Sequence, residues 1–272
     1  MTGPPAEGST TLTWVGHSSV LIDTGRERIL TDPLLTDRVA HLRRRAGNIT
    51  DDHGDVDFAV ISHAHMDHLH LPSLRRLSPR AELVVPTGTG KLAQRSRRTV
   101  RADVRVGDRV DVGATTIEVT EAVHKHGRGP HSRVRAQPVG FVMDTDATRV
   151  YFAGDTDLFD AMADLGPIDV ALVPIWGWGA SIGVGHLDPA RAARATALIA
   201  PRFVVPIHWG TFAPEDARRG APGWLDRPLA RFADELDAVG LGDRLLALEP
   251  GGSARVGSAP DRGPAAGEPG ED

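Results

Sequence analysis

The stretch Ser62-His63-Ala64-His65-Met66-Asp67-His68 decides the fold, and it directly follows the apolar run Phe58-Ala59-Val60-Ile61. The apolar run predicts a short buried strand, because it ends at a polar turn. Alternate residues of a strand point to opposite faces, so the three histidines and the aspartate must lie in the loop after the strand. Imidazole and carboxylate groups are good ligands for zinc and similar divalent ions. The stretch therefore predicts a metal site, rather than a polar turn that happens to be rich in histidine.

This stretch resembles the metal-binding motif of the metallo-β-lactamase fold. The phrases WVGHSSVLID, SHAHMDH, FAGDTD, GHLDP and PIHWGTF resemble one branch of that superfamily. The branch contains N-acyl-phosphatidylethanolamine phospholipase D and related bacterial hydrolases, with L-ascorbate-6-phosphate lactonase more distant. The resemblance covers roughly residues 11 to 250. It implies an α/β fold: a four-layer αβ/βα sandwich in which two mixed β-sheets are flanked by helices.

The resemblance also implies three further ligands, each in a loop after a later strand. His124 follows the strand-like residues 116–120, and His126 is the alternative to it. Asp155 lies in a Gly-Asp-Thr loop, where the alternative is an N-cap for a helix beginning near Leu158. His208 follows another apolar strand. The implied metal ligands are His63, His65, Asp67, His68, His124, Asp155 and His208.

These ligands divide into two sets, so two divalent ions are expected. His63, His65 and His124 would hold one ion, Asp67, His68 and His208 would hold the other, and Asp155 would lie between them. The chain has no cysteine, so the site must use nitrogen and oxygen ligands. Zn²⁺ is the default, and Mn²⁺ or Fe²⁺ are the alternatives. Two cations lower the pKa of a bridging water, and the resulting metal-bound hydroxide would attack a phosphorus or carbonyl centre.

Asp67 and three other residues are candidates for supporting roles. Asp67 could orient or deprotonate the water, and His186, in the phrase GHLDP, could donate a proton to the leaving group. The alternative for His186 is a helix-start histidine that bonds the backbone. Asp32 could orient a ligand imidazole or simply form a turn before Pro33. His17 also follows a strand and could face the cleft, although a lone histidine is more often structural.

We therefore expect a metal-dependent hydrolase of a phosphodiester or another anionic ester. The alternatives are a lactonase of the same fold and a non-catalytic metal-bound sensor. A small anionic ester or lipid-like substrate could meet the basic residues Lys125, Arg128, Arg133 and Arg135. The Gly/Trp-rich residues 176–185 predict a flexible apolar loop over the site, or else ordinary packing of the indoles. Nothing in the sequence indicates an oligomeric state.

Composition narrows the class of protein. The 272 residues carry a formal net charge of −5, which is a poor basis for nonspecific binding of nucleic acid, so none is expected. The sequence has no apolar run long enough for a transmembrane helix, and residues 1–10 do not resemble a secretory signal. These features predict a cytoplasmic protein. We expect a loose N-terminus over 1–10, one metallo-hydrolase domain over 11–250 and a disordered tail over 251–272, which is rich in Gly, Pro, Ala and acids.

Overall fold

The computed structural model describes residues 8–129, 131–177, 179, 181–214 and 223–257. Its largest sheet has seven strands, in which the first part of the chain is antiparallel and the β3-β6-β7-β8 part is parallel. In spatial order the strands are β16 (Ser253–Gly257), β1 (Ser9–Gly16), β2 (Ser19–Asp23), β3 (Arg28–Thr31), β6 (Phe58–Val60), β7 (Glu82–Pro86) and β8 (Thr99–Val104).

A second mixed sheet has six strands. β9 to β12 form an antiparallel meander, and β13 and β14 are added in parallel. Its spatial order is β14 (Phe203–Ile207), β13 (Val170–Pro174), β12 (Arg149–Phe152), β11 (Val139–Asp144), β10 (Thr115–Glu121) and β9 (Arg109–Val112). A small third sheet joins β15 (Phe212–Pro214), β5 (Leu42–Arg44) and β4 (Arg38–Val39).

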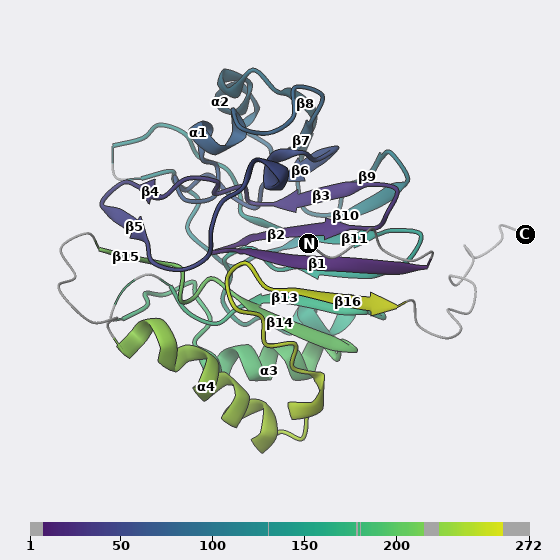
Figure 1. Ribbon diagram of the computed structural model, residues 1–272, viewed down its shortest axis with the longest axis vertical. Helices are drawn as coiled ribbons and strands as arrows, with labels where there is room; N and C mark the ends of the chain where they lie inside the picture. Colours follow the sequence, from purple (N-terminus) through teal and green to yellow (C-terminus); the bar gives the residue numbers. More distant parts are fainter. Residues whose placement is uncertain (1–7, 130, 178, 180, 215–222, 258–272) are drawn as a thin grey trace, which may run out of the picture.

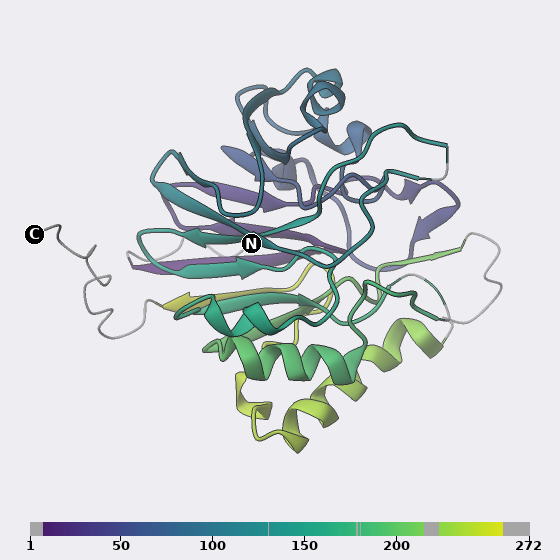
Figure 2. The same ribbon diagram turned by 180° about the vertical axis from the view of Figure 1, so that it is seen from behind.

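Helices cover the outer sides of the two large sheets. Figures 1 and 2 show α1 and α2 on one side of the molecule, α3 and α4 on the other, and the sheets between them. This is the four-layer αβ/βα sandwich that the sequence predicted. The helices are α1 (Leu71–Leu74), α2 (Gly90–Ala93), α3 (Pro189–Ile199) and α4 (Gly223–Ala238), with 3₁₀ turns η1 (Asp51–Gly54), η2 (Gln94–Ser96), η3 (Asp160–Asp164) and η4 (Gly242–Arg244).

The apolar core lies between the two large sheets. Side chains from β1, β2 and β6 meet those from β10, β11 and β12, and the largest of them are fully buried: Trp14, Phe58, Phe141, Tyr151 and Phe152. A separate cluster, including Leu74 and Leu83, packs on the other face of the first sheet beneath α1. Burial of apolar surface stabilises the folded state by about 25 cal/mol per Å². The packed core therefore fixes the strand ends from which the polar loops emerge.

Helix α3 begins as its sequence predicts. The Asp188 side chain accepts a hydrogen bond from the backbone N–H of Arg191, and Pro189 occupies the first helical position. The helix ends at Ile199, because Ala200 adopts a left-handed conformation. The cap fixes where the chain enters the helix, and so fixes the loop that carries His186.

Both predicted chain ends need correction. Residues 253–257, predicted as part of a disordered tail, form β16, which pairs antiparallel with β1. Ser9 and Thr10, predicted as loose, belong to β1 and are buried. Backbone pairing along β1 gives β16 its order, although the segment has few large apolar side chains. The remaining residues of the two predicted ends, 1–7 and 258–272, lie outside the described residues.

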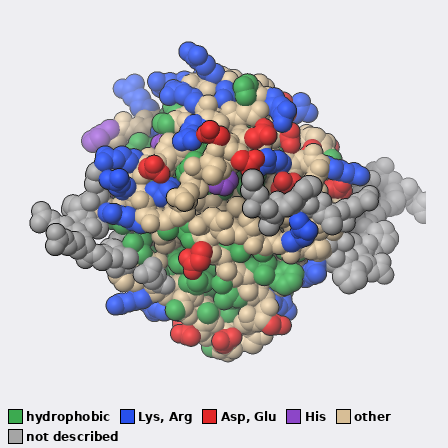
Figure 3. All heavy atoms as spheres, in the orientation of Figure 1, with side chains coloured by type: hydrophobic (Ala, Val, Ile, Leu, Met, Phe, Trp, Pro, Cys, Tyr) green, Lys and Arg blue, Asp and Glu red, His purple; other side chains and the backbone are tan. Residues whose placement is uncertain are grey.

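Charge is unevenly spread over the surface. In Figure 3 Lys and Arg side chains gather on the upper part of the face, where Figure 1 places α1, α2 and β8. Exposed basic residues of this region are Lys91, Arg95, Arg97, Arg101 and Arg105. This face is therefore basic although the net charge of the whole chain is −5. The absence of a nucleic-acid partner stays a prediction. Among the described residues, no helix is both long and apolar enough to cross a membrane.

Candidate metal centre

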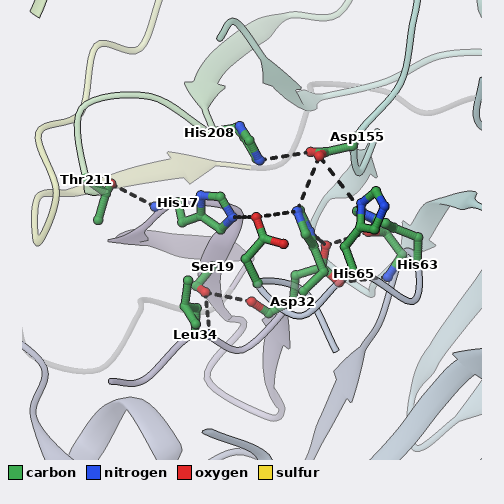
Figure 4. Close-up of polar contacts among 12 residues, drawn as sticks. His17, Ser19, Asp32, Leu34, His63, His65, Asp155, His208 and Thr211 are labelled. Atoms are coloured by element: carbon green, nitrogen blue, oxygen red, sulfur yellow. Dashed lines mark hydrogen bonds and ion pairs between the residues drawn. The ribbon is translucent and has the colours of Figure 1, made fainter. Parts of the chain in front are cut away.

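The seven residues predicted as ligands converge on one point, and each lies in a loop that follows a strand. The loop after β6 carries four of them, and the loops after β10, β12 and β14 carry His124, Asp155 and His208. Figure 4 shows the Asp155 carboxylate directed between His208 and the loop of His63 and His65. Asp155 Oδ1 lies 3.2 Å from His208 Nε2, and its Oδ2 lies 3.9 Å from the Nε2 atoms of both His63 and His124. Asp155 is thus central to the cluster.

Three ring nitrogens meet on one side of Asp155. His65 Nδ1 lies 2.9 Å from His63 Nε2 and 3.1 Å from His124 Nε2. On the other side, His68 Nε2 lies 3.3 Å from Asp155 Oδ2 and 3.7 Å from Asp67 Oδ2. The two groups match the two sets into which the sequence divided these residues.

Hydrogen bonds on the far side of each ring fix which nitrogen faces the cluster. The Gly185 carbonyl oxygen can only accept, so His124 donates to it through Nδ1–H, over 2.6 Å, and the Nε2 lone pair stays free. His208 donates Nδ1–H to the Trp176 carbonyl oxygen over 2.9 Å. Metal-ligating histidines usually hold their second ring nitrogen in this way.

Asp32 and Ser62 fix the orientation of two histidine rings in the loop after β6. The Ser62 hydroxyl donates to Asp32 Oδ2 over 2.5 Å, so it must accept from His63 Nδ1–H, which is 2.9 Å away. His68 Nδ1 lies 2.6 Å from the same Asp32 oxygen. Of the two alternatives for Asp32, the structure favours orientation of ligand imidazoles, because this buried carboxylate contacts one ring directly and a second through Ser62.

The donor set fits divalent cations. Among the described residues, buried polar atoms without a hydrogen-bond partner include His68 Nε2, His208 Nε2 and Asp155 Oδ1, all of which face the centre of the cluster. His63 Nε2 and His124 Nε2 both keep a lone pair, so a single proton on His65 Nδ1 would have to serve two acceptors, at 2.9 and 3.1 Å. Cations placed among these atoms would satisfy them, and imidazole with carboxylate suits zinc, manganese or iron.

Burial and charge set the protonation of the cluster. Burial lowers the pKa of His63 well below its usual value and that of His65 to about 4, so both rings are neutral near pH 7. For His68 burial acts in the same direction, but Asp155, Asp67 and Asp32 outweigh it and raise the pKa well above 6.5. For Asp155 burial opposes charge, yet His208 and His68 hold its pKa well below the usual range. Cations would replace the protons on His68 and His208.

Comparison with protein families identifies this arrangement. A family model described as a beta-lactamase superfamily domain matches residues 27–209, a range that contains all seven clustered residues. The chain belongs to this superfamily. It is a metal-dependent hydrolase with the metallo-β-lactamase fold, as the motif after β6 predicted.

Individual relatives carry similar descriptions. The N-acyl-phosphatidylethanolamine-hydrolyzing phospholipase D 1 of Caenorhabditis elegans is 30% identical over 74% of this chain, which spans only 64% of that relative's length. A UPF0173 metal-dependent hydrolase of Pyrococcus horikoshii is 32% identical, over 75% of this chain and 86% of its own. A metallo hydrolase of Ignicoccus hospitalis, with 24% identity, matches the fold with a TM-score of 0.69 over 91% of this chain and 98% of its own.

His186 of the hydrolase lies at the edge of the cluster. Its Nδ1 is 3.7 Å from Asp155 Oδ2, and its ring centroid is 4.6 Å from that of His124. Burial lowers the pKa of His186 to about 4, so the ring is neutral near pH 7. Together with His208, it lines a pocket of about 200 Å³, whose other described lining residues are Gly177, Gly179, Ser181, Ile182 and Gly183.

The described part of the predicted Gly/Trp loop lies next to the pocket, and the choice between a flexible loop and packing of the indoles stays a prediction. Gly177, Gly179 and residues 181–183 border the pocket, whereas the Trp176 indole N–H donates to the Gly179 carbonyl oxygen. Trp178 and Ala180 lie outside the described residues.

Other candidates in the segment after β10 are used differently. His126, the alternative to His124, is exposed, as are Lys125, Arg133 and Arg135. Arg128 is half-buried, and its Nη1 donates to the carbonyl oxygens of Ala64 and Leu69. It therefore secures the loop after β6, besides any contact with a substrate.

Sequence reasoning undervalued His17. The residue is buried, and its Nε2 lies 3.1 Å from Asp67 Oδ2. Its ring centroid is 4.1 Å from that of His208. The position of His17 after β1, at the same strand edge as the other site residues, was the available signal.

Proposed function

We propose that the protein hydrolyses a phosphodiester or another anionic ester with the help of two divalent cations, most simply Zn²⁺. The observation that carries this proposal is the position of Asp155 between the two groups of imidazoles: Oδ1 faces His208, and Oδ2 lies 3.3 Å from His68 Nε2 and 3.9 Å from the Nε2 atoms of His63 and His124. A carboxylate placed in this way can bridge two cations. His63, His65 and His124 would hold one cation, and Asp67, His68 and His208 the other.

Two cations held there would lower the pKa of a water molecule and polarise the bond to be broken. The chain's own residues supply the frame. Asp32, Ser62, Gly185 and Trp176 fix ring tautomers through the bonds described above, so that the ligand atoms need little rearrangement when cations bind.

His186 is proposed as a catalytic residue that contacts the substrate. As a neutral imidazole it can accept a proton from the attacking water at Nδ1, and it can then return that proton to the leaving group. Its buried Nδ1, which has no hydrogen-bond partner, and its place in the lining of the pocket support this role. His186→Asn should lower kcat by about 10²-fold to 10⁴-fold with unchanged metal content. A loss of bound metal in this variant would make His186 a ligand instead.

The pocket is proposed to receive one substituent of the ester. Among the described residues its lining joins Gly177, Gly179 and Gly183 with Ser181, Ile182 and the two histidines. A Cβ added at Gly183 would meet no heavy atom within 4 Å, so Gly183→Val should fill the pocket without displacing its neighbours. The variant should raise KM for esters with a bulky substituent and leave the small ones unchanged.

A lipid-like ester is the substrate class we favour. The worm relative is described as hydrolysing N-acyl-phosphatidylethanolamine, although this chain spans 64% of its length. Exposed apolar side chains next to the cluster would suit an acyl chain: Met66, Val123 and Val184.

Assays with matched substrates test this function. We expect chelator-sensitive cleavage of bis-p-nitrophenyl phosphate and of phospholipids, and faster cleavage of the lipids. Turnover of a simple lactone without phosphodiester cleavage would replace this proposal with a lactonase. Bound metal without turnover of any of these esters would contradict it and favour a sensor.

A further inference from the structure

We infer that His17 is a positioning residue that holds Asp67 in the orientation needed to bind a cation. This inference rests on the proposed function, because it concerns the cation set of Asp67, His68 and His208. It adds a residue from the first turn of the chain to a site otherwise built from later loops.

The His17 ring lies next to all three residues of that cation set. Its Nε2 lies 3.1 Å from Asp67 Oδ2, which makes it the donor of a hydrogen bond to the carboxylate. Its centroid lies 4.1 Å from the ring of His208 and 5.0 Å from the ring of His68. Figure 4 shows His17 on the side of the cluster away from His63 and His65.

The His17 backbone is held equally firmly. Its N–H donates to Thr211 Oγ1 over 2.8 Å, and its carbonyl oxygen accepts from the His208 N–H over 2.9 Å and from the Trp14 indole over 2.9 Å. The ring is therefore fixed relative to the His208 loop, and through Nε2 it fixes Asp67 relative to the same loop. Asp67 comes from the first sheet and His208 from the second, so His17 sets the spacing between ligands of different sheets.

Backbone strain also points to a role at the site. His17 and His208 both have positive φ angles, 55° and 63°, a conformation that is uncommon for residues other than glycine. Such strain persists only where the surroundings enforce it, and it is frequent at functional sites. The two residues are joined by a backbone hydrogen bond, so their strained conformations form one unit.

A hydrogen bond, rather than a ligand bond, explains the contact best. His17 Nε2–H has no lone pair left for a cation, and Asp67 Oδ2, which accepts from it, also lies 3.7 Å from His68 Nε2, on the side of the cluster. Loss of such an outer contact typically lowers metal affinity by about 10-fold to 100-fold. The effect should be confined to one of the two cation positions, because His63, His65 and His124 do not depend on Asp67.

Two replacements separate this role from packing. His17→Phe keeps an aromatic ring against His208 and Phe212 but has no donor. His17→Gln offers an amide N–H that can reach the Asp67 carboxylate. Exposed His131, replaced by Gln, is the matched control. Each protein is titrated with Zn²⁺ against a competing chelator, and Co²⁺ spectra report the geometry of each position. Thermal unfolding of the metal-free variants checks that they fold.

We expect His17→Phe to weaken one of the two positions by about 10-fold to 100-fold and to leave the other unchanged, while His17→Gln stays within a few-fold of the wild type. Wild-type affinity at both positions in the Phe variant would overturn the inference. So would a Gln variant as weak as the Phe variant, which would make His17 a ligand. A wild-type protein that takes up no metal would instead overturn the proposed function.

Discussion

Asp32 Oδ2 lies 2.6 Å from His68 Nδ1, and both side chains are completely buried. The other oxygen of Asp32 accepts the Ser62 backbone N–H over 2.7 Å. One carboxylate therefore ties the end of β3 to the start and the end of the metal loop. It links the first sheet to the residues that we propose as metal ligands.

Replacing Asp32 by Ala should weaken metal binding and destabilise the fold. Metal affinity should fall by about 10-fold to 100-fold, because His68 and Ser62 lose the group that orients them. Unfolding of the metal-free protein should cost about 3 to 5 kcal/mol less, since buried partners are left unpaired. Chelator competition and urea unfolding measure the two effects. Exposed Asp164→Ala is the control, and an equal loss there would show that the effect is not specific to the site.

Asp155→Ala should abolish binding at both cation positions, because Asp155 is the residue that faces both ligand groups. By contrast, His65→Ala should impair one position more than the other. Metal content after dialysis distinguishes the two variants. A protein with Asp155→Ala that still holds one cation tightly would mean that the carboxylate serves a single position.

The cap of α3 can be tested without touching the cluster. Asp188→Ala should lower the free energy of unfolding by about 1 kcal/mol, because the Arg191 N–H loses its acceptor. Asp188→Asn should be nearly neutral, since Asn caps helices as well as Asp does. Denaturant unfolding measures both variants. If Asn proved as harmful as Ala, the charge of Asp188 rather than its capping bond would matter.

The burial of Tyr151 predicts that the protein loses stability at high pH. Burial raises the pKa of Tyr151 well above its usual value near 10. The unfolded chain therefore ionises first, so this contribution to stability is complete below pH ~10 and is lost as the pH rises further, at about 1.4 kcal/mol per pH unit. Tyr151 is the only tyrosine, so tyrosinate absorbance reports it directly. Tyrosinate should form together with unfolding, and its formation in the folded protein would contradict the burial argument.

The local parts of this structure were the most predictable. Residues 58–60 form a strand where an apolar run ends in a turn, and α3 begins after an Asp-Pro pair. The motif after β6 and three later strand ends predicted which residues come together in the cluster; that they bind metal stays a prediction. Local pattern was sufficient in these places because burial and capping are properties of adjacent residues.

Long-range pairing was less predictable. β16 has a composition typical of disorder, and only its alignment with β1 gives it structure. The contact between His17 and Asp67 joins residues 50 positions apart in the sequence, and no local pattern announces it. Arg128 could not be assigned to the carbonyl oxygens of the metal loop for the same reason.

Metal stoichiometry coupled to turnover tests the central claim most directly. The purified protein is stripped with a chelator and reloaded with Zn²⁺ by dialysis. Its metal content and its hydrolysis of bis-p-nitrophenyl phosphate are then measured at each stage. The account predicts about two ions per chain in the reloaded protein, with activity lost on stripping and restored on reloading. A folded protein that takes up no Zn²⁺, Mn²⁺ or Fe²⁺, or whose hydrolysis is unaffected by their removal, would contradict it.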